Sequence, residues 1–384
     1  MKKIFIFIML ICCVNFFPIV VFAEDNELIQ NASSGLLMEV DTGKIIFKKD
    51  INKRLAIASM TKMVAQIIVM ENIESGKIKW NDIVIVSKNA ADMGGSQIYI
   101  AEGEKISVED LMKGISMASG NDATVAMAEY ISGSEKKFVD LMNKKVKELG
   151  LKNTYFKNCT GLDEDGHYSS AYDMAIIAKE LITKYPDIFK FSSVYEDYLR
   201  ENTENKFWLV NTNKLVRFYD GADGLKTGHT DNAGYCLAAT AKRNGLRLVA
   251  IVLGESNASV RNNETMELLD YGFQNLKSNK LRSKGEVVKK IKLDKADHEI
   301  VDIVLKDDLI VVENVDDDKK YDYEVDIDNF KLPVKVGDVV GKINVYYKNK
   351  IVKTNELTVN NDINSLSFLK LFSNEFLDLL TGKF

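Results

Sequence analysis

The sequence has 384 residues, of which 46% are hydrophobic and 28% are charged, and its formal net charge is −5 at pH 7. This balance is that of a globular protein, and the length predicts about two domains, because single cores rarely grow beyond about 300 residues. The acidic charge gives no reason to expect nucleic-acid binding, which needs a basic face, and the 3 prolines exclude a long proline-rich linker.

The first 23 residues are predicted to be a targeting signal rather than part of the fold. Two lysines precede a run from Ile4 to Val21 that is apolar apart from Asn15, and the small residue Ala23 follows shortly after it. This order is typical of a secretory signal, so residues 1–23 are assigned to one that is cleaved after Ala23. An uncleaved membrane anchor is the alternative, because the apolar run approaches the length of a membrane span.

Residues 24–278 mix strand and helix patterns and are assigned to one domain. Strand patterns lie at both of its ends, and five segments with apolar residues at helical spacing lie between them. This order predicts an α+β domain in which a helical layer covers an antiparallel sheet. The Asn244-Gly245 pair between two apolar runs is a strong hairpin signal. The predicted strands are 35–40, 44–47, 235–242 and 246–253, and the predicted helices begin at Ser59 or cover 108–118, 122–131, 135–149 and 171–184.

The remaining sequence changes character twice. Short alternating runs at 309–312, 321–327 and 342–347, separated by turns, predict a small all-β domain over residues 279–360. Residues 361–384 carry apolar residues at helical spacing and predict an amphipathic helix. At the tail of an exported protein such a helix suits the membrane surface; packing on its own domain or against a second copy are the alternatives.

The cysteines and histidines give no sign of redox or metal chemistry. Outside the signal, Cys159 and Cys236 remain. A disulfide between them is permitted outside the cytoplasm, but Cys236 lies in an apolar run, which favours a buried, unreactive thiol. The histidines have no metal-ligand spacing, so we expect no metal and no cofactor. They are His167, His229 and His298.

The first motif suited to catalysis is Ser59-Met60-Thr61-Lys62. Ser59 begins a predicted helix whose main face is apolar, and Lys62 follows one turn later on the same side. A lysine inside a core is desolvated, which lowers its pKa and makes a neutral amine available to take the serine proton. A capping serine with a snorkelling lysine would give the same pattern, so this motif is weak alone.

The second motif, Ser119-Gly120-Asn121, lies at a turn between two predicted helices. Ser119 offers a hydroxyl for proton transfer, and Asn121 offers an amide that can hold Lys62 or a substrate carbonyl. Ordinary turn and capping chemistry would also explain Asn121.

The third motif, Lys226-Thr227-Gly228, precedes the predicted hairpin, where an edge strand is expected. Gly228 would let a substrate backbone approach closely, and Lys226 and Thr227 suit a terminal carboxylate. The backbone N–H of His229 is placed to complete an oxyanion hole with that of Ser59.

In this order the three motifs resemble the signature of penicillin-binding proteins and serine β-lactamases, and the Ser-Gly-Asn form resembles the D-Ala-D-Ala carboxypeptidase branch. The likeness includes Gly161-Leu162-Asp163 and Gly224–Thr230, and it spans nearly the whole chain after the signal. It implies a β-lactamase/transpeptidase-like domain, followed by the small all-β domain and the amphipathic helix.

The resemblance implies an exported serine D-Ala-D-Ala carboxypeptidase that removes the terminal D-Ala from peptidoglycan stem pentapeptides through an acyl-enzyme, in cell-wall biogenesis. Its implied partners are peptidoglycan stem peptides, β-lactam antibiotics as acylating inhibitors, and a membrane surface reached through the C-terminal helix. Its implied location is the outer face of the cytoplasmic membrane or the cell wall. The implied catalytic residues are Ser59, Lys62, Ser119 and Asn121, and the implied substrate-binding residues are Lys226, Thr227, Gly228, His229 and Thr230.

Three other functions remain open at this point. A serine β-lactamase would need a group that activates water, and no Glu-x-x-Leu-Asn segment lies between Asn121 and Lys226. A D,D-endopeptidase would share every motif. A non-catalytic β-lactam or cell-wall binder would be expected to lose Ser59 or Lys62, and both are present.

Overall fold

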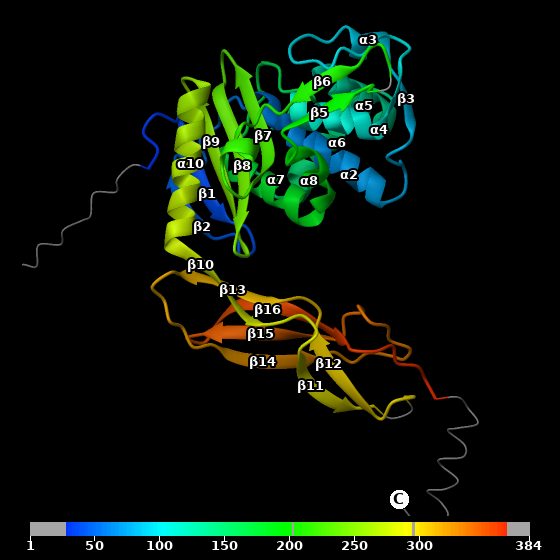
Figure 1. Ribbon diagram of the computed structural model, residues 1–384, viewed down its shortest axis with the longest axis vertical. Coiled ribbons are helices and arrows are strands. Elements are labelled where there is room, and N and C mark those ends of the chain that lie inside the picture. Colours follow the sequence, from blue (N-terminus) through cyan, green and yellow to red (C-terminus); the bar gives the residue numbers. More distant parts are fainter. Residues whose placement is uncertain (1–27, 202, 294–295, 367–384) are drawn as a thin grey trace, which may run out of the picture.

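The computed structural model describes residues 28–201, 203–293 and 296–366. It contains a mixed domain, in which helices cover a central sheet, and a second domain made of strands (Figure 1). The predicted α+β arrangement with a following all-β domain is therefore confirmed.

The central sheet has five antiparallel strands in the order β2-β1-β9-β8-β7. Successive residues of a strand point to opposite faces, so Leu36 and Met38 join the core on one face while Leu37 joins the core on the other. Because both faces are covered, the inner strands β8 and β9 contain long apolar runs. The five strands are β1 (Ser34–Glu39), β2 (Ile45–Lys49), β7 (Ala222–Thr230), β8 (Gly234–Arg243) and β9 (Leu246–Glu255).

The turn between β8 and β9 is the predicted hairpin. Asn244 and Gly245 have φ of 48° and 84°, and positive φ at both central residues suits a two-residue turn between twisted strands. The hairpin leaves β7 at the edge of the sheet, as expected from the third motif.

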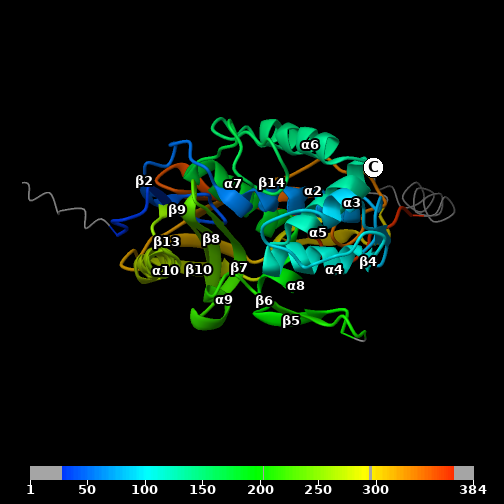
Figure 2. The same cartoon turned by 90° about the horizontal axis from the view of Figure 1, so that it is seen from above.

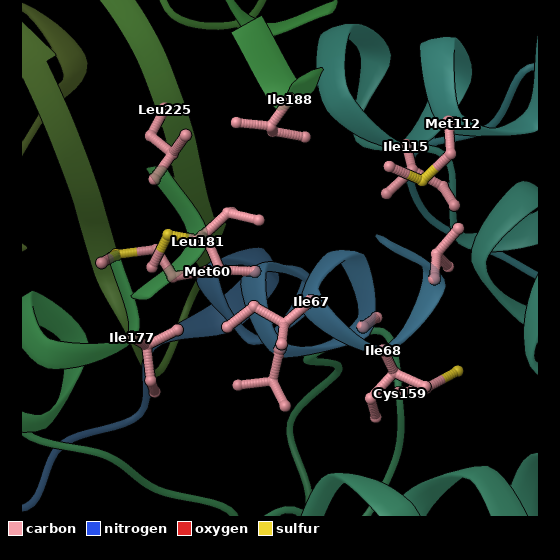
Figure 3. Close-up of a cluster of buried hydrophobic side chains, with 14 of the residues drawn as sticks. Met60, Ile67, Ile68, Met112, Ile115, Cys159, Ile177, Leu181, Ile188 and Leu225 are labelled. Atoms are coloured by element: carbon pink, nitrogen blue, oxygen red, sulfur yellow. The ribbon is translucent and has the colours of Figure 1, made fainter. Parts of the chain in front are cut away.

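Helix α2 (Lys62–Glu74) runs through the larger core, and every residue from Lys62 to Met70 is buried. Figure 3 shows Ile67 and Ile68 in this core together with Ile177 and Leu181. The surrounding helices are α3 (Lys88–Ala91), α4 (Val108–Lys113), η2 (Gly114–Ala118), α5 (Asn121–Ser132), α6 (Glu135–Glu148), α7 (Ala171–Lys184), η3 (Pro186–Ile188), α8 (Phe189–Ser192) and α9 (Leu215–Phe218).

Serine side chains begin three of the predicted helices. Ser107, Ser134 and Ser170 each accept a hydrogen bond from a backbone N–H three residues further on. This satisfies one of the unpaired donors of a helix N-terminus and explains why α4, α6 and α7 begin where the sequence predicts.

Two helical segments differ from the prediction. The segment predicted as one helix over 108–118 changes after Lys113 into the π-helical η2. Helix α10 (Ala258–Asn275) was not predicted, because its sequence is rich in polar residues and only a narrow face packs on the sheet. On that face Gly272 lies so close to β9 that a Cβ there would be 2.5 Å from the Leu248 side chain.

The second domain follows α10 without a linker, since β10 begins at Leu276. It contains a five-stranded antiparallel sheet in the order β11-β12-β16-β15-β14 and the pair β10-β13. Its own core includes Ile303, Ile343 and Leu357. The strands are β10 (Leu276–Arg282), β11 (Val287–Lys292), β12 (Ile300–Leu305), β13 (Leu309–Asn314), β14 (Asp322–Ile327), β15 (Gly341–Tyr347) and β16 (Lys350–Val359).

The predicted C-terminal helix is wrong for residues 361–366. Ile363 is buried in the core of the second domain and exchanges two backbone hydrogen bonds with Val334, of 2.8 and 2.9 Å. Its apolar side chain therefore packs in the core of the β domain and does not lie on the face of a helix. Residues 367–384, which carry the rest of that prediction, and the predicted signal at 1–23 lie outside the described residues. Among the described helices, none has the length and apolarity needed to cross a membrane.

Candidate active site

Ser59 lies in a 3-10 turn (Ala58–Thr61) that leads directly into α2. One turn further on, Lys62 Nζ lies 2.8 Å from Ser59 Oγ. Lys62 is fully buried, whereas Ser59 is partly exposed. The hydroxyl is therefore the atom of this pair that an incoming molecule can reach.

Two further oxygen atoms surround Lys62 Nζ. The Asn121 side-chain oxygen and the Thr160 carbonyl oxygen each lie 2.7 Å from it. Asn121 Nδ2 donates a hydrogen bond to the Gly94 carbonyl oxygen at 2.7 Å, which fixes the amide with its oxygen toward the lysine.

Burial lowers the pKa of Lys62 from 10.5 to about 7, although Cys159 and Asp122 act in the opposite direction. A neutral amine has two hydrogens and one lone pair. The oxygens of Asn121 and Thr160 can only accept hydrogen bonds, so they take both N–H groups. The lone pair then faces the Ser59 hydroxyl, and this arrangement makes Lys62 a base directed at Ser59.

Ser119 ends η2 in a left-handed conformation with φ of 62°. Such a conformation is strained for a residue other than glycine, and the Gly120 N–H holds the turn by donating to the Gly114 carbonyl oxygen at 3.1 Å. The turn starts α5 at Asn121, which is how that side chain reaches Lys62. Ser119 is buried, and within the described part of the chain its hydroxyl has no hydrogen-bonding partner.

Strand β7 passes directly against the Ser59 turn. A Cβ on Gly228 would lie 2.5 Å from the Ile57 carbonyl oxygen and 3.3 Å from the Met60 nitrogen. The sequence predicted that Gly228 makes room for a substrate backbone; in the structure it makes room for the protein's own turn. This close packing brings the third motif beside Ser59.

Lys226 and Arg261 form a pair of buried cations beside this strand. Burial lowers the pKa of Lys226 well below its usual value, and the charges of Lys62 and Arg261 lower it further. Among the described residues, no carboxylate lies within ion-pair distance of Lys226 or Arg261. An anionic ligand would favour the charged form of Lys226, so two buried basic groups without a carboxylate partner suit a site for an anionic group.

The last residues of β7 have different environments. The Thr227 hydroxyl donates to the Thr212 hydroxyl at 2.8 Å. His229 is exposed and packs its ring on Tyr235, while its backbone directly follows Gly228. The Thr230 hydroxyl donates to Asp163 at 2.8 Å and so holds the loop around Asp163; its expected contact with a substrate carboxylate stays a prediction.

Sequence reasoning missed three residues of this site. Arg261 lies on α10, the helix that was not predicted. Thr160 acts through its backbone carbonyl, which the side chain does not reveal. Thr212 lies two residues after β6 (Phe207–Val210), in a segment with no catalytic pattern. The sequence offered no signal for Arg261, because neither its helix nor its burial was predicted.

Replacing Gly161 with alanine is expected to reduce the free energy of unfolding by about 2–5 kcal/mol. Gly161 has φ of +85°, and a Cβ there would lie 1.9 Å from the Ala58 carbonyl oxygen. The backbone that presents Thr160 to Lys62 would have to move away from the Ser59 turn. Chemical denaturation measures the change, and hydrolytic activity should fall with it.

Gly166→Ala is the matched control for this prediction. Gly166 has a similar φ of +83°, but its Cβ would meet only the flexible side chain of Lys157, at 3.1 Å. The Gly166→Ala variant therefore measures the cost of positive φ for alanine without a clash against backbone atoms. Equal destabilisation by both substitutions would show that the close approach to Ala58 does not constrain the site.

The two cysteines and His167 support the fold of the site. Cys159 and Cys236 are free and buried, and burial raises the pKa of both thiols, that of Cys236 to about 11. The prediction of buried thiols, rather than a disulfide, is confirmed. His167 Nδ1 accepts from the Lys157 N–H and Nε2 lies 2.8 Å from Thr61 Oγ1, so a neutral ring donates through Nε2 and braces the Ser59 turn.

The sequence matches two family descriptions in succession. Residues 21–257 match the family described as D-alanyl-D-alanine carboxypeptidase, and residues 276–365 match the C-terminal domain of penicillin-binding protein 5. The chain is 46% identical over 349 residues to the D-alanyl-D-alanine carboxypeptidase DacF of Bacillus subtilis, covering 90% of this chain and 89% of that protein. It is 33% identical over 344 residues to DacA of Escherichia coli K12, covering 87% and 84%.

Solved structures give the same result. The chain is similar to penicillin binding protein 5 from Haemophilus influenzae, with 32% identity, a TM-score of 0.68 and coverage of 88% of this chain and 98% of that one. It is also similar to penicillin-binding protein D2 from Listeria monocytogenes in its ampicillin-bound form, with 30% identity, a TM-score of 0.57 and coverage of 63% and 97%. The chain belongs to the D-alanyl-D-alanine carboxypeptidase family of low-molecular-mass penicillin-binding proteins. It is a serine-type peptidase, and its cell-wall substrate class implies that it acts outside the cytoplasm.

Proposed function

We propose that Ser59 is the nucleophile that attacks the carbonyl of the penultimate D-Ala of a stem peptide, with Lys62 as its general base. The observation that carries this proposal is the position of Lys62 Nζ, 2.8 Å from Ser59 Oγ, with its other two hydrogen bonds fixed by Asn121 and Thr160. A buried amine with a pKa of about 7 is half neutral near physiological pH, as a general base requires.

The backbone beside Ser59 suits the negative charge that develops in this reaction. The N–H of Ser59 lies at the start of α2, and the N–H of His229 follows Gly228, whose chain packs on the same turn. Two backbone donors on rigid elements would hold the oxyanion of the tetrahedral intermediate. We assign this role to the N–H groups of Ser59 and His229.

The buried cations suit the carboxylate of the departing D-Ala. Arg261 supplies positive charge, and an anionic ligand would favour the charged form of Lys226. The Thr227 hydroxyl supplies a hydrogen-bond donor if its single hydrogen turns from Thr212 to the carboxylate. A substrate that ends in a carboxylate would replace the missing anionic partner of these side chains. The specificity of the enzyme for the free C-terminus of a peptide follows from this arrangement.

Ser119 and Asn121 complete the proton path. The serine proton taken by Lys62 must reach the amine of the leaving D-Ala, and the unpartnered Ser119 hydroxyl is positioned by the same turn that places Asn121 on Lys62. Water then attacks the ester on Ser59, with Lys62 again as base, and releases the shortened peptide.

The same residues would be acylated by β-lactams. The solved relative from Listeria monocytogenes is described with bound ampicillin and with bound cefotaxime, which supports β-lactam binding by this chain. We also propose that the chain is exported and held at the outer face of the membrane by its C-terminal segment, since that segment has the amphipathic pattern of a surface helix.

Release of D-Ala tests the proposed reaction. The purified protein is incubated with an acylated peptide that ends in D-Ala-D-Ala, and free D-Ala is measured beside the Ser59→Ala variant. We expect release by the parent and a fall of about 10⁵-fold or more in the variant. Release that survives in Ser59→Ala would refute Ser59 as nucleophile. No release from the folded parent would refute the carboxypeptidase reaction and leave cleavage of crosslinks as the activity to measure.

A further inference from the structure

A row of aromatic side chains lies exposed on the outside of the first domain. The strands β5 (Glu196–Leu199) and β6 (Phe207–Val210) form a hairpin that precedes the short helix α9. We call the exposed aromatic residues of this hairpin and of α9, together with the half-buried Tyr195 that directly precedes β5, the aromatic strip. The strip consists of Tyr195, Tyr198, Trp208 and Phe218, of which Trp208 is 56% exposed and Phe218 is 68% exposed.

The hairpin presents these rings because of its register. Tyr198 pairs directly with Trp208, so the two side chains lie side by side on one face. On the opposite face Leu199 and Leu209 are completely buried and fix the hairpin to the domain. The exposed rings are therefore held on a rigid support, which reduces the entropy that binding would cost.

Polar groups able to meet hydroxyls lie between the rings. Lys206 Nζ lies 3.8 Å above the Tyr198 ring. The Arg217 guanidinium lies 4.8 Å from the centre of the Tyr195 ring and 3.9 Å from a Glu196 carboxylate oxygen. Because cations and a carboxylate alternate with the aromatic rings, the surface suits a ligand that has both apolar faces and many hydroxyl or amide groups.

The chain that follows the hairpin leads to the third motif of the active site. Thr212, two residues after β6, contacts Thr227 of the third motif and donates its backbone N–H to the Met117 carbonyl oxygen at 3.0 Å. Figure 2 shows the hairpin and α9 projecting from the same side of the domain, next to β7. A polymer bound along the strip would hold its side branches close to Ser59.

We propose that the aromatic strip binds the sugar backbone of a peptidoglycan strand while one of its stem peptides occupies the active site. Sugar rings present C–H faces that stack on aromatic rings, and their hydroxyl and acetamido groups hydrogen-bond to charged side chains. The stem peptide of the substrate is attached to such a strand, so both parts of one molecule would be bound together. Linking two contacts in this way raises affinity without changing the chemistry at Ser59.

Binding and turnover of intact cell wall test this proposal. The Trp208→Ala and Phe218→Ala variants of the full chain are compared with the parent for sedimentation with peptide-free glycan strands. We expect each variant to bind about 3-fold to 10-fold more weakly. Hydrolysis of insoluble peptidoglycan should fall by a similar factor, whereas kcat/KM for a short soluble D-Ala-D-Ala peptide should stay within about twofold.

Tyr172→Ala provides the control, since Tyr172 is an aromatic residue on α7 that is 37% exposed and lies outside the strip. It should change none of these measurements. Unchanged glycan binding by both strip variants would overturn the proposal. A loss of activity seen only on cell walls that retain teichoic acids would also overturn it. The glycan-binding measurement uses no turnover, so it distinguishes failure of this inference from failure of the proposed reaction.

Discussion

Replacing Lys62 with methionine is expected to lower kcat/KM for a D-Ala-D-Ala peptide by about 10²–10⁴-fold. Methionine retains most of the lysine's buried volume but removes the amine that lies 2.8 Å from Ser59 Oγ. Acylation by a fluorescent penicillin should slow by a similar factor, because the same proton transfer is needed. A thermal unfolding transition confirms that the variant is folded, and acylation at the parent rate would contradict the assignment of the base.

The pH profile of the parent enzyme gives a second test that needs no substitution. Lys62 acts only when neutral, and its pKa is lowered to about 7 by burial. We therefore expect kcat/KM to rise with pH through about 7 and to level above it. A rate that falls as pH rises through 7 would require Lys62 to act as an ammonium group.

Replacing Arg261 with methionine should remove selectivity for a terminal carboxylate. We expect kcat/KM for the peptide acid to fall by about 10²–10³-fold, because a buried cation that pairs with the substrate is lost. The same peptide with a C-terminal amide has no charge to pair and should be affected little. The ratio of the two rates is the measurement.

Arg243→Met is the control for this substitution. Arg243 stacks on Tyr219 and Phe273 beside the start of β7, at the opposite end of that strand from Gly228, so its loss should leave the acid-to-amide ratio unchanged. If Arg261→Met slows both substrates equally, the guanidinium supports the fold of the site and does not bind the carboxylate.

Much of the site was predictable because its chemistry is encoded in side chains close in sequence. One helical turn separates Ser59 from Lys62, so their contact follows from the helix alone. The burial of Lys62 followed from the apolar character of α2. The positions of Asn121 and Lys226 needed the resemblance to known enzymes, since nothing in their spacing places them beside Ser59.

Other features depended on tertiary packing that the sequence does not display. Helix α10 has few apolar residues, so no strong helical period marks Arg261. The change from α4 to η2 leads into the strained turn at Ser119, which no helical period marks. Ile363 lies at helical spacing from the apolar residues that follow it, but in the structure its side chain is buried in the core of the β domain. Gly228 was expected to let a substrate backbone approach closely, and the sequence did not show that a side chain there would also meet the Ser59 turn.

The direct passage from α10 into β10 has a mechanical consequence. Asn275 ends the helix and Leu276 begins the strand, so the chain offers no free hinge residue between the domains. Beyond them, the described chain leaves the β domain near Ile363, paired with Val334. Wherever that end is fixed, the second domain would act as a spacer of set length. The layer of cell wall that Ser59 can reach would then be selected by distance as well as by chemistry.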